Sequence, residues 1–232
     1  MTMFNILFVL ILNTSSLSNG IENSSWYRDI NGVIEVKIYS DKFFVVSKYD
    51  SNNKTFISTK GGRYSWDNGY YEILEFNSSD STSVGDTVYY SNVKVNINND
   101  SGKMIIDGIK FNKYPNKDNL SGAWLMSGIE RRGEMRMRDV TRPRKTLKML
   151  AGGRFQWIAY DTSKKGFYGT GGGTFTAVDG KYIENIEFFS RDSNTVGKSL
   201  EFDYEIKEGD WHHKGFSSKG DPKYEIWTKR KQ

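Results

Sequence analysis

The sequence repeats itself at a spacing of 111 residues, and this repeat constrains the fold more than any single motif. VKIYSDKFFVVSKYD at Val36–Asp50 aligns with LKMLAGGRFQWIAYD at Leu147–Asp161, and KTFISTKGGRYS then aligns without a gap with KGFYGTGGGTFT. After a shift of one residue, EILEFNSSDSTSVGD aligns with ENIEFFSRDSNTVGK. Order, spacing and residue type agree across all three stretches, which indicates an internal duplication. We expect two copies of one domain, a divergent first copy at 21–117 and a second copy at 118–232.

Each copy contains short runs of apolar and aromatic residues separated by turn residues, a pattern typical of strands. Aromatic residues make up 15% of the chain, which suits a pleated sheet surface. No stretch shows a sustained helical period. The strands expected in the second copy are Gly122–Gly128, Lys145–Leu150, Arg154–Tyr160, Phe167–Thr176, Tyr182–Phe189, Ser199–Ile206, Asp210–Phe216 and Tyr224–Arg230. The sequence therefore predicts an all-β protein of two tandem antiparallel up-and-down β-barrels, since barrel closure removes exposed edges.

Alternation along these strands predicts which side chains face the barrel interior. In SLEFDYEI, Phe202 and Tyr204 share an apolar face, while acidic residues occupy the other. In YEIWTKR, Tyr224 is expected to face inward and Trp227 outward. RFQWIAY is ambiguous by alternation alone. Its positions that are apolar in both copies are Phe155 and Trp157, and we expect these two to face inward.

The second copy begins with Gly122-Ala123-Trp124 on its first strand and carries Arg230 on its last. This pair resembles the Gly-x-Trp and late-Arg signature of lipocalins and related calycin barrels. RFQWIAYDTSKKGFYGTGGGTFTAVDGKYIENIEFFSRD, followed by GDWHHKGFSSKGDPKYEIWTKR, is similar to a family of bacterial secreted lipocalin-like domains of uncharacterised function, over about 120–230. The resemblance implies a barrel in which Trp124 closes one end and Arg230 covers it. It supplies no activity, and the first copy departs from it at Ser24-Ser25-Trp26.

The N-terminus contains a short apolar segment, MFNILFVLIL, followed by small polar residues. About 20 residues are needed to span a bilayer, so this segment is too short for a transmembrane helix. Such a segment predicts a signal peptide at 1–18, although a buried N-terminal strand is the alternative. No later segment is apolar enough to span a membrane. We therefore expect a secreted, periplasmic or cell-envelope protein.

The glycine run Gly171–Gly173 invites comparison with phosphate-binding loops. A phosphate-binding loop needs a following Lys-Ser/Thr and a helix, whereas here Thr174-Phe175 follow within a strand pattern. Because Gly172 and Gly173 recur in the first copy, we expect them to serve the barrel backbone. Gly169 and Gly171 occur in the second copy alone, so any functional signal would lie with them.

No arrangement of side chains indicates catalysis, a metal site or a cofactor, and the chain has no cysteine. Glu184 and Glu187 are three residues apart and so point to opposite faces of a strand. Glu184 is expected to face inward, either in a buried ion pair or against a ligand amine. His212 and His213 likewise point to opposite faces, with His213 inward; it could bind a haem iron, but a structural role is preferred.

Seven basic residues lie in ERRGEMRMRDVTRPRK, the connection between the first two strands of the second copy. Residues 120–232 carry 21 basic and 15 acidic residues, whereas 21–119 carry 12 and 13, so the net charge of +5 comes from the second copy. The run could be a solvated loop or a barrel mouth that attracts anions. Nucleic acid is not expected, because the run has no interleaved aromatic residues.

These observations favour an exported, non-enzymatic binding protein whose second barrel holds a small hydrophobic or amphipathic ligand. The residues expected to contact the ligand are Phe155, Trp157, Glu184, Phe202, Tyr204, His213 and Tyr224. One alternative is a cell-envelope structural or protein-interaction module with filled barrels, in which Trp227 contacts a partner. The other is an enzyme or haem-handling barrel that uses His213.

Overall fold

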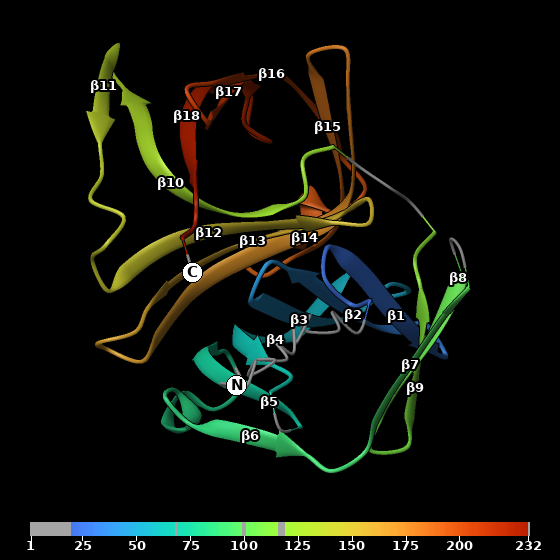
Figure 1. The fold of residues 1–232 in the computed structure, drawn as a ribbon. Coiled ribbons are helices and arrows are strands. Elements are labelled where there is room, and N and C mark those ends of the chain that lie inside the picture. Colours follow the sequence, from blue (N-terminus) through green and yellow to red (C-terminus); the bar gives the residue numbers. More distant parts are fainter. Residues whose placement is uncertain (1–19, 68, 99–100, 116–118, 232) are drawn as a thin grey trace, which may run out of the picture.

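The computed structural model describes residues 20–67, 69–98, 101–115 and 119–231. The predicted signal peptide and the predicted boundary between the copies lie outside these residues. The strands of the described residues form two nine-stranded antiparallel sheets (Figure 1). Two short 3-10 helices, η1 (Ser81–Ser83) and η2 (Ser193–Thr195), lie between strands. The predicted fold class, all-β with two tandem units, is confirmed.

The second copy is a closed barrel. Its strands are β10 (Gly122–Arg131), β11 (Glu134–Met137), β12 (Arg144–Ala151), β13 (Arg154–Asp161), β14 (Gly166–Val178), β15 (Lys181–Phe189), β16 (Ser199–Lys207), β17 (Asp210–Phe216) and β18 (Pro222–Lys229). Pairing of β10 with β18 closes the eight strands that the sequence predicts, with small differences at their ends. The sequence did not predict β11, a short strand that pairs with the end of β10 outside this ring.

The first copy is a curled sheet that does not close. Its strands are β1 (Ser24–Ile30), β2 (Val33–Ser40), β3 (Phe43–Asp50), β4 (Thr55–Ser65), β5 (Tyr70–Asn77), β6 (Thr87–Tyr90), β7 (Val93–Asn98), β8 (Ser101–Ile106) and β9 (Ile109–Lys113). In the second copy, β16 alone pairs with both β15 and β17. In the first copy that role is divided between β6 on β5 and β7 on β8, so these two strands form the edges of the sheet.

The repeated glycines allow close approach of neighbouring backbones, as predicted. A Cβ on Gly173 would lie 1.9 Å from the carbonyl oxygen of Asn185 on the paired strand. A Cβ on Gly62 would lie 2.0 Å from the carbonyl oxygen of Ile73. The register of β14 against β15 shifts between Gly172 and Gly173, and β4 shifts against β5 at the equivalent place. The glycine pair therefore forms the same β-bulge in both copies.

The two sheets pack against each other through the outer faces of β2–β4 and β12–β14 (Figure 1). One buried cluster draws on both copies, and many of its members are equivalent under the repeat. Its larger residues are Val36, Ile38, Phe43, Tyr49, Phe76, Leu147, Met149, Ile158, Tyr160 and Phe188. Phe56 stacks on its own equivalent, Phe167, with ring centroids 6.2 Å apart. The copies are thus related by an approximate two-fold axis through this interface.

Polar contacts across the interface repeat with the same symmetry. The Tyr160 hydroxyl donates to Glu75 at 2.7 Å, and the Tyr49 hydroxyl donates to Glu187, the equivalent of Glu75. Arg230 binds Glu75 at 2.7 Å. The equivalent carboxylates of Glu75 and Glu187 therefore stabilise the contact between the two copies.

Arg230 does not have the position that the family resemblance implied. Its guanidinium lies 4.0 Å from the centre of the Phe43 ring in the other copy. Trp124 is buried in the second barrel, 5.9 Å from Trp211. No helix among the described residues is long and apolar enough to cross a membrane.

Candidate functional site

The second barrel contains a cavity of about 990 Å³. Its apolar wall is made of Met126, Trp157, Ala159, Ile186, Phe189, Leu200, Phe202 and Trp227. Its charged residues are Arg131, Arg138, Asp139, Arg142, Arg144, Lys148, Glu184, Arg191, Lys223 and Glu225. The arginines are exposed and mark the mouth, whereas Lys148, Glu184 and Glu225 are buried and mark the floor. A volume of this size lies within the range of small-molecule sites.

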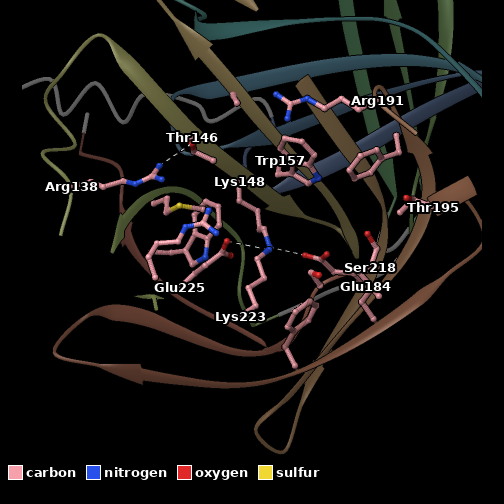
Figure 2. Close-up of a pocket in the computed structure, with 18 of the residues that line it drawn as sticks. Arg138, Thr146, Lys148, Trp157, Glu184, Arg191, Thr195, Ser218, Lys223 and Glu225 are labelled. Atoms are coloured by element: carbon pink, nitrogen blue, oxygen red, sulfur yellow. Dashed lines mark hydrogen bonds and ion pairs between the residues drawn. The ribbon is translucent and has the colours of Figure 1, made fainter. Parts of the chain in front are cut away.

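A buried ion pair lies at the floor of the cavity. The Lys148 Nζ is 2.7 Å from Glu184 Oε1, and both residues are almost fully buried (Figure 2). The ammonium also lies 5.0–6.0 Å from the centres of four aromatic rings, those of Phe155, Tyr182, Trp211 and Trp227. Burial alone would raise the pKa of Glu184, but the Lys148 charge together with the smaller contributions of His213 and Lys223 makes the net shift downward. Burial also lowers the pKa of Lys148, against the opposing attraction of Glu184.

A second charged group lies beside the first. Glu225 accepts from Lys223 at 3.1 Å, and its other oxygen lies 3.4 Å from His213 Nδ1. Burial would raise the pKa of Glu225, but Lys223 and His213 together lower it. Figure 2 shows Lys148 and Lys223 extending toward each other between Glu184 and Glu225.

His213 is neutral in this setting. Burial lowers its pKa to about 4, with a further contribution from the Lys148 charge. Its Nε2 has no hydrogen-bond partner among the described residues, so a second N–H on the ring would lack an acceptor. The predicted inward orientation is confirmed. His213 does not line the cavity, and this placement favours the structural role over binding of a haem iron.

The predicted ligand-contacting residues divide into three groups: those that line the cavity, those that face the interior without lining it, to which His213 belongs, and Tyr224, which lies outside. Trp157, Glu184 and Phe202 line the cavity. Phe155 belongs to the core of the second barrel, and Tyr204 packs against that core, so both face the interior as predicted. The prediction that Glu184 joins an inward base in an ion pair is also confirmed.

The prediction for the last strand is wrong. Tyr224 lies on the outer face, where its hydroxyl is 2.8 Å from His212 Nδ1. Trp227 is 1% exposed and lines the cavity, so it cannot contact an external partner. In YEIWTKR, Tyr224 lies on one face of the strand and Trp227 on the other, so both faces are apolar enough to be buried. The register settles the choice, because Trp227 pairs with the buried Trp211 on β17.

Sequence reasoning missed Lys148 and Glu225 as residues of the site. Lys148 aligns with Lys37, and that repeat was a usable signal, because Lys37 lies 3.9 Å from Glu72 in the first copy. Glu225 was missed because the prediction placed its face of the last strand outside the barrel, and its partner His213 becomes adjacent only when β17 and β18 pair.

The cavity exists because four inward positions differ between the copies. In the first copy these positions carry long charged side chains, namely Arg28, Glu35, Lys48 and Lys60. In the second copy their equivalents are Met126, Thr146, Ala159 and Gly171. The first copy correspondingly has a hollow of only about 230 Å³ at the same place. The absence of these four charged side chains therefore leaves space in the second barrel.

The arginine-rich run is an insertion. Trp26 pairs with Lys37 and Trp124 pairs with Lys148, so the tryptophans are 98 residues apart and the lysines 111. The difference, 111 minus 98, leaves 13 extra residues between Trp124 and Lys148, which include the end of β10 and all of β11. The first copy has only a tight turn there, between β1 and β2. The insertion contributes Arg131, Arg138 and Arg142 to the cavity, in agreement with the predicted mouth.

Comparison with known proteins finds a family match over the second copy. Residues 119–232 match the profile of the family described as domain of unknown function DUF4488. This match covers the whole closed barrel. No curated protein matches the chain. Among the described residues, no group of three or more acidic or histidine side chains is arranged to hold a metal ion.

Proposed function

We propose that the chain is an exported, lipocalin-like binding protein whose second barrel holds a small amphipathic molecule. The observation that carries the proposal is that four equivalent inward positions hold long charged side chains in the first copy and uncharged residues in the second. The curled sheet of the first copy carries Arg28, Glu35, Lys48 and Lys60 at these positions, whereas the closed barrel of the second copy is open over about 990 Å³.

The first copy has the filled interior expected of a structural module. Its core holds a dense set of aromatic and aliphatic residues, among them Trp26, Tyr39, Phe44, Tyr64, Tyr70, Met104 and Phe111. The Arg28–Glu35 pair occupies the inner wall with an Nη2–Oε2 distance of 2.6 Å. We assign the first copy a supporting role and the second copy the binding role.

The proposal is tested by returning the first-copy wall to the second copy. The variant Met126→Arg/Thr146→Glu/Ala159→Lys places in the cavity the side chains that fill the first copy, where the same backbone accommodates them. The probes are cis-parinaric acid and its neutral methyl ester, whose fluorescence rises in apolar surroundings. Thr176→Lys adds a charge on the exposed face of β14 and serves as the matched control.

We expect saturable binding of at least one probe by the unchanged protein, with one probe per chain. The triple variant should weaken binding of the ester by more than about tenfold, because the ester would have to displace buried charged groups. Ala159→Lys alone should give an intermediate loss, and Thr176→Lys should give none. Binding of neither probe, or unchanged binding by a folded triple variant, would overturn the proposal.

A further inference from the structure

We propose that the arginine-rich insertion is a head-group site, which selects ligands carrying an anionic group on an apolar body. This inference rests on the proposed function and specifies the class of ligand. The chemistry it names is a carboxylate, sulfate or phosphate group attached to a tail or ring system. The insertion has no counterpart in the first copy, where the cavity is also missing.

The arginines at the mouth lack protein partners for their charges. Among the described residues, no carboxylate forms an ion pair with Arg131, Arg138, Arg144 or Arg191, although all four line the cavity. Arg142 differs, because it lies 3.6 Å from Asp139. Neighbouring guanidinium groups without counterions repel one another, and a bound anion would relieve that repulsion.

Arg138 interacts electrostatically with two other arginines of this group, Arg131 and Arg144. Its one side-chain hydrogen bond among the described residues is a long one, 3.5 Å from Nη1 to Thr146 Oγ1. Partial burial lowers the pKa of Arg138, and the charges of Arg131 and Arg144 lower it further, against an opposing contribution from Glu225. Most of its N–H donors thus remain available to a ligand, and a guanidinium presents such donors in a planar fork that suits oxyanions.

Tyr168 holds the other two arginines in place. The Arg144 guanidinium lies 4.2 Å from the centre of the Tyr168 ring. Arg191 donates from Nε to the Tyr168 carbonyl at 2.9 Å. Gly169 makes this contact possible, since a Cβ there would lie 2.6 Å from Arg191 Nε. Gly169 is one of the two glycines that only the second copy has.

The first copy lacks every part of this arrangement. The equivalents of Arg144, Tyr168, Gly169 and Arg191 are Val33, Ile57, Ser58 and Ser79, and the insertion itself is absent. The arginine group and the cavity therefore occur together in one copy and are both missing from the other.

The opposite end of the cavity fixes the orientation of the ligand. Lys148 and Lys223 are paired with Glu184 and Glu225, so the floor has no unpaired cation for an anion to neutralise. Between floor and mouth lies an apolar wall that includes Trp157, which Figure 2 shows between Arg191 and Lys148. The apolar body of the ligand lies along this wall, and its anionic group lies among the arginines.

The test compares cis-parinaric acid with its methyl ester, which share the same tail and differ in the head group, an anionic carboxylate in one and a neutral methyl ester in the other. Arg138→Gln removes one arginine of the mouth. Arg136→Gln removes an equal charge from β11 at a residue that does not line the cavity, and it is the matched control. Inorganic phosphate at millimolar concentration, added as a competitor, distinguishes a free-anion site from a site for an amphiphile.

We expect the unchanged protein to bind the acid at least about tenfold more tightly than the ester, because hydrogen bonds from the arginines to a charged carboxylate are stronger than those to a neutral ester. Arg138→Gln should remove most of this preference and leave ester binding unchanged, whereas Arg136→Gln should retain it. Phosphate should not displace the acid.

Three outcomes would overturn the head-group site. Equal affinity for acid and ester would refute it and leave the proposed function standing. Loss of the acid preference in Arg136→Gln to the same extent as in Arg138→Gln would reduce it to a general charge effect. Displacement of the acid by phosphate would indicate a free-anion site. Binding of neither probe would instead refute the proposed function itself.

Discussion

Protonation of His213 is predicted to destabilise the second barrel between pH 6.5 and pH 4. The ordinary pKa of a histidine is 6.5, and burial lowers that of His213 to about 4. The unfolded chain therefore binds a proton in this window before the folded chain does. Stability is fully retained above pH 6.5 and falls as the pH drops toward 4.

The size of the effect follows from the two pKa values. A difference of 2.5 between 6.5 and 4 corresponds to about 3.4 kcal/mol once both states are titrated. At pH 4.5 the folded state is partly protonated, so we expect a loss of about 2.5 kcal/mol relative to pH 7.5. The lowered pKa of Glu225 adds a further loss at still lower pH, below the ordinary value of 4.5.

Two measurements test this prediction. The chain has only two histidines, so proton NMR of the imidazole resonances gives the His213 pKa directly, with His212→Gln to assign the signals. Urea unfolding at pH 7.5 and 4.5 gives the free energy, and His213→Gln, which can still donate to Glu225, should remove about 2.5 kcal/mol of the pH dependence. A His213 resonance that titrates near 6.5, or a His213→Gln variant with the same pH dependence as the unchanged protein, would refute the reasoning.

Two further substitutions test the interface and the bulge. Glu187→Ala should cost about 3 kcal/mol in urea unfolding, because it leaves Arg154, with a side chain only 3% exposed, without its carboxylate at 2.6 Å. Glu201→Ala removes an exposed ion pair from the same barrel and should cost less than about 1 kcal/mol; equal costs would contradict the interface argument. Gly173→Ala should cost more than about 2 kcal/mol, since its Cβ would overlap the Asn185 carbonyl oxygen. A melting temperature unchanged by Gly173→Ala would contradict this, because it would show that β14 and β15 can move apart without loss of stability.

The repeat made the fold predictable, because two aligned copies report twice on each constraint. Comparison of the two copies alone assigned Gly172 and Gly173 to the barrel backbone and Gly169 and Gly171 to the second copy's own features, and the structure supports this distinction. The first pair forms the bulge in both copies, whereas Gly169 makes room for Arg191 in one. Sequence comparison within one chain therefore distinguished backbone requirements from features specific to the cavity.

The inner faces of strands at the interface are hard to predict from alternation for a physical reason. The outer face of a barrel is ordinarily polar, and alternation then identifies the inner face. Here much of the outer surface is buried against the other copy, so apolar residues occur on both faces of several strands. Tyr160 is fully buried at the interface, and Trp157, on the opposite face of the same strand, lines the cavity. Only the pairing register resolves such strands, as it did for Trp227.

Duplication also explains why the two interiors could diverge so far. The interface requires the same features of both copies, and the Tyr49–Glu187 and Tyr160–Glu75 contacts show that these features have been kept in both. The interiors are under no such shared requirement, because neither contributes to the contact. The first copy could therefore retain a filled interior and supply stability through the interface. The second could carry Ala159 and Gly171 in place of charged side chains and so contain a cavity. The packing contacts missing at the cavity destabilise the barrel, and contacts at the interface offset part of this cost. This division predicts that substitutions within the first copy's interior change stability but leave the acid-to-ester preference of the second barrel unchanged.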